Sequence, residues 1–131
     1  MKQTSLEPVE TIILDCDHIL SYAGGDSEQL VRLCANFLRE LPIHMNALRI
    51  AFKHGETFAA ERTLRLLGNC LVVLGSGAVS STMEALESGL RCGNTRQARR
   101  EWVRIQEHLQ QIVPQVQRLM LEVTTPRSAV Q

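Results

Sequence analysis

Apolar residues recur every three or four positions along most of the chain, which is the spacing of one buried helix face. Asp26 is a candidate N-cap for the first long helix. The stripe that follows it consists of Leu30, Cys34, Phe37, Leu41, Met45, Leu48 and Phe52. Pro42 lies within this stripe and removes one backbone hydrogen bond. The pattern therefore predicts a kinked helix that continues to His54-Gly55, and it leaves a break into two helices open.

A short helix and a second long helix are predicted on either side of this segment. Asp17 is the candidate cap of the short helix, which extends to about Ala23 because two glycines follow. The second long helix spans residues 56–74 and is ended by the glycine-rich turn 75–77. Its inward stripe consists of Ala60, Leu64, Leu67, Leu71 and Leu74.

Two more helices are predicted over residues 78–91 and 95–123, with Gly93-Asn94 as the stop signal between them. The inward residues of the first are Val79, Met83, Leu86 and Leu90. Those of the second are Trp102, Ile105, Leu109, Ile112, Val116 and Leu119. Pro114 lies inside the last stripe and should bend that helix without ending it.

One short helix and four long helices with short connections predict an all-α, up-and-down four-helix bundle with a short additional N-terminal helix. The chain has 131 residues, enough for one core. We therefore assign residues 1–123 to a single domain and residues 124–131, which lack a pattern, to a disordered tail. Hydrophobic residues make up 44% of the sequence and aromatic residues only 4%, as suits a core of aliphatic side chains between helices.

Charge and cysteine content narrow the classes of partner. Fourteen basic residues balance fourteen acidic ones, which makes nucleic acid an improbable partner. No apolar run reaches the length of about 20 residues that spans a bilayer, and residues 1–10 lack a signal-peptide core.

The four cysteines form no C-x-x-C pair, so we expect free thiols in a reducing cytoplasm. Cys16-Asp17-His18 could hold a metal only with ligands from elsewhere, and we expect neither a metal nor a cofactor.

Several short sequence motifs follow one another in order between about Leu14 and Leu119. They are Gly24-Gly25-Asp26, Phe37-Leu38, Pro42, Ala51, Gly55-Glu56, Leu74-Gly75 and Ala85-Leu86-Glu87. In this order the chain resembles the bacterial histidine-containing phosphotransfer (HPt) domain. The resemblance implies a helical signalling module of two-component phosphorelays.

The position of the family's phosphorylated histidine falls on an arginine. In the family this histidine heads an H-x-L-K-G motif, about nine residues after the acidic residue of G-D and ten before the glycine of L-G. Counting forward from Glu56 and back from Gly75 both reach Arg65. A register that starts at Arg62 needs a three-residue insertion, which would rotate the following stripe off the core.

Only the structural residue of that motif is kept. Leu67 matches the leucine, whereas Gly68 replaces the lysine and Asn69 replaces the glycine. A guanidinium stays protonated and cannot attack phospho-aspartate as an imidazole does. The resemblance therefore implies a non-catalytic member of the family.

The helix that carries Arg65 can still dock a partner. Helical spacing predicts that Arg65, Gly68, Asn69, Val72 and Ser76 share one face, and Arg62 lies one turn before them. The resemblance implies that this face binds a response-regulator receiver domain or a sensor kinase. The donor fork of Arg65 could pair with the carboxylates of a receiver, or Arg65 could be an ordinary solvated side chain.

A different histidine could restore phosphotransfer. His18 lies in the short helix and His54 at a predicted helix end, while His44 and His108 are predicted on helix flanks. An active phosphotransfer protein that uses one of them, with His44 and His108 as the first to test, is the second hypothesis.

A third hypothesis is a helical self-association module unrelated to phosphorelay. It predicts a dimer interface around Arg65 and Val72, and the oligomeric state is expected to be a monomer or a weak homodimer.

Arginines also gather on one side of the last predicted helix. Arg96, Arg99, Arg100 and Arg104 share that side with Glu101 and Glu107, which moderate the charge. The group is either a solvated helix face or a docking surface for an anionic partner. The serines lack a G-x-S-x-G context, so a hydrolase has no support.

Overall fold

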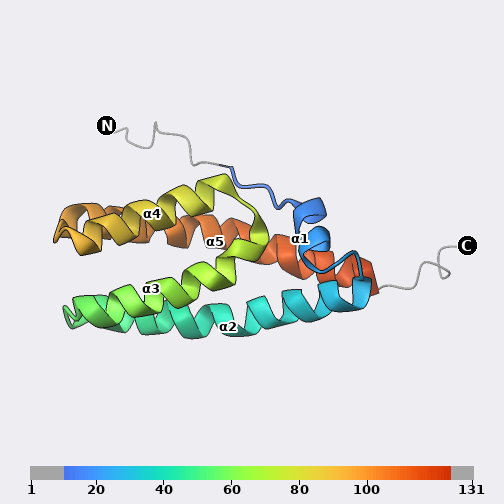
Figure 1. Cartoon of the computed structure of the whole chain (residues 1–131), viewed down its shortest axis with the longest axis horizontal. Helices are drawn as coiled ribbons and strands as arrows, with labels where there is room; N and C mark the ends of the chain where they lie inside the picture. The colour runs from blue at the N-terminus through green and yellow to red at the C-terminus, as the bar shows by residue number, and fades with distance from the viewer. Residues whose placement is uncertain (1–10, 125–131) are drawn as a thin grey trace, which may run out of the picture.

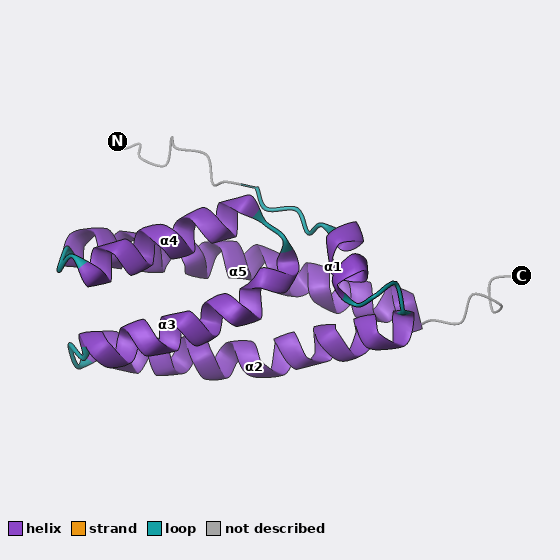
Figure 2. Cartoon of the chain, in the orientation of Figure 1, coloured by secondary structure: helices purple, strands orange, loops and turns teal. Residues whose placement is uncertain are grey.

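Helices are the regular elements of this computed structural model, which describes residues 11–124 (Figures 1 and 2). They are α1 (Cys16–Tyr22), α2 (Ser27–Lys53), α3 (Thr57–Leu71), a 3₁₀ turn (Val72–Leu74), α4 (Gly77–Arg91) and α5 (Thr95–Thr124). No strand occurs between residues 11 and 124, and the predicted all-α class is confirmed. Thr124 belongs to α5, and the rest of the predicted tail lies outside the described residues.

The four long helices pack in a cycle. α2 contacts α3 and α5, and α4 contacts the same two helices from the other side. Figure 1 shows α2 beside α3 and α4 beside α5, with the short α1 against the 3₁₀ turn at one end. Each long helix therefore directs one face toward a shared core, and each leaves one face outward.

The predicted stripes form that core. Leu48 of α2, Leu67 of α3, Leu86 of α4 and Ile105 of α5 have no measurable exposure. All inward residues predicted for α3 and α4 are buried, whereas Met45, Phe52, Trp102 and Leu119 at the edges of the α2 and α5 stripes are half-buried. The spacing of apolar residues thus predicts which side of each helix faces inward.

Both prolines lie inside unbroken helices. α2 continues through Pro42 and α5 continues through Pro114. The predicted continuity is confirmed, and the alternative of a break at Pro42 is wrong. Burial of the stripe on both sides of each proline compensates for the missing hydrogen bond.

The cap predicted for the short helix is wrong by two residues. Asp15 is the N-cap of α1, and its Oδ1 accepts a hydrogen bond of 3.0 Å from the backbone N–H of His18. Asp17 lies in the first turn, where its charge still complements the helix dipole. The predicted cap of α2 is confirmed, since Asp26 Oδ1 accepts from the backbone N–H of Glu28 at 2.9 Å.

Gly75 makes the turn between the 3₁₀ segment and α4. Its φ of +66° lies in the left-handed region that favours glycine. A Cβ at this position would lie 2.5 Å from ring carbons of His18, so a side chain cannot fit. The absence of a side chain at Gly75 therefore lets α1 approach the 3₁₀ turn closely.

An extended segment at the start of the described chain binds to α5. The side-chain oxygen of Gln111 accepts a 2.9 Å hydrogen bond from the N–H of Ile12, and that of Gln115 accepts one of 2.8 Å from the N–H of Leu14. Gln115 Nε2 also donates to the carbonyl of Ile12 at 2.8 Å. Ile12 and Leu14 are buried, whereas Ile13 between them is 77% exposed.

Gln115→Leu should loosen this segment and lower the free energy of unfolding by about 1–2 kcal/mol, because it removes two hydrogen bonds to the segment's backbone. Amide hydrogen exchange at Leu14 should accelerate in the variant. Gln117→Leu, at an exposed position on the same helix, is the matched control. Unchanged exchange at Leu14 in Gln115→Leu would contradict the role assigned to this glutamine.

Candidate functional site

The outward side of α3 combines apolar and basic residues. Phe58 is 80% exposed, Leu66 49% and Val72, in the 3₁₀ turn, 53%. Arg62, Arg65 and Asn69 are also exposed and alternate with them along the helix. We call these six residues the α3 face. Burial of the opposite stripe in the core leaves them no orientation other than outward.

Four of the six predicted docking residues, Arg62, Arg65, Asn69 and Val72, lie on this surface as expected. Arg65, Asn69 and Val72 are exposed, and Arg62 lies one turn before them. Gly68 is half-buried at the edge, because a Cβ there would lie 3.8 Å from Met83 Cε of α4. Gly68 therefore lies on the side of α3 that is next to α4, at the border of the α3 face.

Ser76 does not share this face, so that part of the prediction is wrong. α3 ends at Leu71, and the 3₁₀ turn with Gly75 then redirects the chain. Ser76 is instead the N-cap of α4, where its Oγ accepts a 3.2 Å hydrogen bond from the N–H of Val79. α-Helical spacing cannot be extended past Leu71, because the 3₁₀ turn has a different rotation per residue.

The two arginines of the α3 face keep their charges available. Within residues 11–124, neither Arg62 nor Arg65 takes part in an ion pair. Leu66 lies next to Arg65 in the sequence and presents its side chain to solvent. A partner can thus meet two guanidinium groups and an apolar contact on one helix.

A groove between α2 and α3 adjoins the α3 face. Its lining includes Leu66 and Asn69 of that face, and Glu40, His44 and Cys70. Burial, and then the Glu40 carboxylate, raise the pKa of Cys70 to about 11. The Cys70 thiol therefore stays protonated near neutral pH and is a poor nucleophile.

His44 is the only histidine in that lining. Its side chain is 16% exposed, and its Nε2 lies 3.6 Å from Glu40 Oε1. This half-buried position agrees with the helix flank predicted for it. His54 is the exposed C-cap of α2, and exposed His18 packs on Gly75.

His108 does not lie on a helix flank, so that prediction is wrong. It is 1% exposed and belongs to the inward side of α5, which it shares with Ile105, Leu109 and Ile112. The spacing of three and four residues from Ile105 to His108 to Ile112 placed it in the stripe, but its polar character masked that signal. A histidine buried this deeply cannot reach a partner's phospho-aspartate in the folded state.

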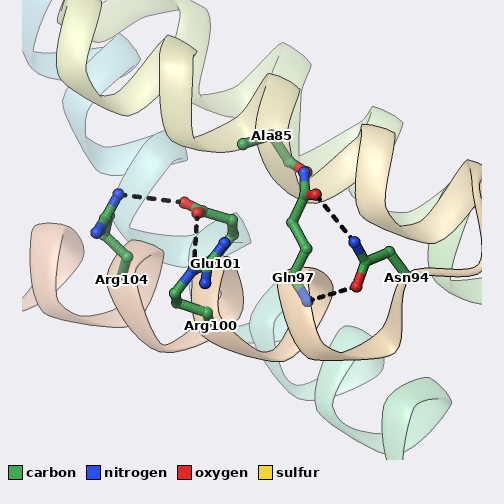
Figure 3. A network of polar contacts seen from close by, with 6 residues as sticks. All are labelled: Ala85, Asn94, Gln97, Arg100, Glu101 and Arg104. Atoms are coloured by element: carbon green, nitrogen blue, oxygen red, sulfur yellow. Dashed lines mark hydrogen bonds and ion pairs between the residues drawn. The ribbon is translucent and has the colours of Figure 1, made fainter.

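Two arginines of the α5 group, Arg100 and Arg104, lie beside a buried carboxylate (Figure 3). Glu101 is 5% exposed, contrary to the solvated position expected for it, and lies 3.7 Å from Arg100 Nε and 3.6 Å from Arg104 Nη1. Nearby, Gln97 Nε2 donates to the carbonyl of Ala85 at 2.9 Å, and Asn94 Oδ1 accepts from the N–H of Gln97. The hydrogen bond from Gln97 to Ala85 joins the start of α5 to α4, whereas the ion pairs of Glu101 lie within α5.

Sequence reasoning missed Phe58 and Leu66. Both are large apolar residues outside the inward stripe of α3. Their spacing from Arg62 and Asn69 places them on the same side of the helix as these two residues, opposite the buried stripe. Large apolar residues on the polar face of an amphipathic helix are the signal that could have identified them.

Comparisons with known proteins return no match from family models, curated proteins or solved structures. Within the described part of the chain, no group of three or more His, Cys, Asp and Glu side chains could hold a metal ion. None of the helices described here combines the length and the apolar character needed to cross a membrane.

Proposed function

We propose that this chain is an HPt-like protein of a cytoplasmic two-component pathway that docks a receiver domain or a sensor kinase without carrying phosphate. The observation that carries the proposal is the α3 face, on which exposed Phe58, Leu66 and Val72 alternate with two arginines that form no ion pair within residues 11–124. The cyclic packing of four long helices supports an up-and-down four-helix bundle of the HPt kind. The sequence motifs support the same family.

The composition of this face suits a protein partner with acidic groups around an apolar patch. Burial of an exposed Leu or Phe side chain contributes about 1.5–3 kcal/mol, which makes Phe58 and Leu66 candidate anchors. Arg62 and Arg65 can each make paired hydrogen bonds to a carboxylate. Receiver domains carry a carboxylate cluster at their phosphorylation site, which fits the charge of these arginines.

Phosphotransfer by another histidine has weaker support. The Glu40 carboxylate lies 3.6 Å from His44 Nε2, so a phosphoryl group on that nitrogen would meet a like charge. His108 is buried. Arg65, at the family's histidine position, cannot accept the group. We therefore favour docking over transfer.

Binding of the protein to the receiver domains of its own organism tests the proposal. We expect Arg65→Glu, Leu66→Asp and Val72→Asp each to weaken binding about tenfold or more, equivalent to about 1.4 kcal/mol. Arg118→Glu and Leu121→Asp change an exposed charge and an exposed apolar residue of α5 and should leave affinity unchanged. Isothermal titration calorimetry gives the affinities.

Four results would contradict docking through the α3 face. The wild type could bind no receiver or kinase, or the α5 controls could weaken binding as much as the α3 variants. Acid-labile phosphate on the protein after incubation with a phosphorylated receiver, lost in His44→Ala, would support phosphotransfer instead. A dimer in solution that Leu66→Asp dissociates, without receiver binding, would support self-association.

A further inference from the structure

A second groove lies between α2 and α5, and both in-helix prolines line it. Leu38, Pro42 and Met45 of α2 and Gln110, Val113 and Pro114 of α5 line it. The groove has a volume of about 560 Å³, within the range of about 300–1,000 Å³ for small-molecule sites. We call it the proline groove, and it is separate from the α3 face.

Each proline leaves a backbone carbonyl without its usual donor. In an α-helix the N–H of a residue binds the carbonyl four residues earlier, and proline has no N–H. Pro42 therefore cannot bind the carbonyl of Leu38, and Pro114 cannot bind that of Gln110. All four residues line the same groove. α2 and α5 contact each other, so the residues that carry the two carbonyls line the same groove from both helices.

The remaining lining is apolar or neutral. Leu41, Met45, Leu109 and Val113 provide aliphatic surface, and three glutamines complete the lining. Among the described residues that line the groove, none carries a charge. An ion would find no opposite charge there, whereas a neutral apolar molecule with a hydrogen-bond donor would satisfy a carbonyl that the helix leaves open.

We propose that the proline groove binds a small neutral molecule with an apolar body and an N–H or O–H donor. The apolar body lies on the aliphatic surface, and the donor binds the carbonyl of Leu38 or Gln110. A ligand of the same shape without a donor would displace water from these carbonyls and replace none of its hydrogen bonds. The groove therefore discriminates by the donor as well as by shape.

Indole and 1-methylindole are matched probes for this site, because they share the ring and only indole has an N–H. NMR titration of the methyl signals of Met45 and Val113 follows binding of each probe to the full chain. We expect indole to bind about tenfold more tightly than 1-methylindole, as a site with unpaired polar groups rejects the analogue that lacks the donor.

Pro42→Ala and Pro114→Ala, singly and together, test the role of the carbonyls. Alanine restores the backbone N–H, so the carbonyl regains its helical donor, and the helix itself should become more stable. If indole binds the carbonyl of Leu38, its preference should fall in Pro42→Ala, and if it binds that of Gln110, in Pro114→Ala. The preference should disappear in the double variant. Asn46→Ala, at an exposed position of α2 outside the groove, should leave it unchanged.

Equal affinity for the two probes in the wild type would overturn donor recognition. A preference that persists in the double variant would overturn the assignment to these carbonyls. Absence of any shift at Met45 and Val113 with either probe would overturn the site. None of these results depends on binding through the α3 face.

Discussion

Leu67→Ala is expected to lower the free energy of unfolding by about 2–5 kcal/mol, the range for deleting a fully buried leucine side chain. Leu67 has no measurable exposure, and Ala60, Leu64 and Leu71 of the same stripe are also buried. The cavity left by the substitution cannot collapse easily between packed helices. Urea denaturation followed by circular dichroism measures the change.

Leu66→Ala is the matched control, because the same substitution is made one residue away at a side chain that is 49% exposed. Exposed substitutions usually change stability by no more than about 0.5 kcal/mol. The difference between the two variants reports which side of α3 faces inward. A larger loss at Leu66 than at Leu67 would place the α3 face in the core and would contradict the docking surface.

Gly89→Ala should destabilise the protein by about 1–3 kcal/mol, although alanine is the better helix former by about 1 kcal/mol. A Cβ on Gly89 would lie 2.9 Å from the backbone nitrogen of Ala98 and 3.2 Å from its Cα. Backbone atoms cannot rotate away as a side chain can, so α4 and α5 would have to separate. Thermal or urea unfolding measures the loss.

Gly68→Ala makes the same substitution where space is available. The nearest atom to a Cβ there is Met83 Cε at 3.8 Å, an ordinary van der Waals distance. Loss of backbone freedom in the unfolded chain should then stabilise the protein by about 0.5–1 kcal/mol. Equal changes in Gly68→Ala and Gly89→Ala would rule out close packing of α4 on α5 as the cause.

The helices could be predicted from the sequence because their signals are local and repeated. Each apolar stripe repeats at helical spacing over several turns, so a single residue that disfavours a helix, such as Pro42 or Pro114, does not change the prediction. The cap of α1 rests on a single residue instead. Asp15 and Asp17 are chemically equivalent candidates, and only the extended backbone of Asp15 (φ −90°, ψ 91°) selects it.

The candidate site was predictable only as far as α3 remains a regular helix. Arg65 and Asn69 follow from the register of Leu64, Leu67 and Leu71. Ser76 lies beyond the 3₁₀ turn, where the angular relation to Arg65 is lost. Polarity misled the prediction for His108 and Glu101, because residue type assigned His108 to a helix flank and Glu101 to a solvated face although the spacing placed both inward.

The binding of Ile12 and Leu14 to α5 sets an order for folding. Their partners Gln111 and Gln115 lie 99 and 101 residues away along the chain. α2 with α3 and α4 with α5 are helical hairpins closed by short turns, and contacts so close in sequence form with little loss of chain entropy. The segment around Ile12 has no surface to bind until α5 exists. We therefore expect the first described residues of the chain to be among the last to reach their native positions during folding.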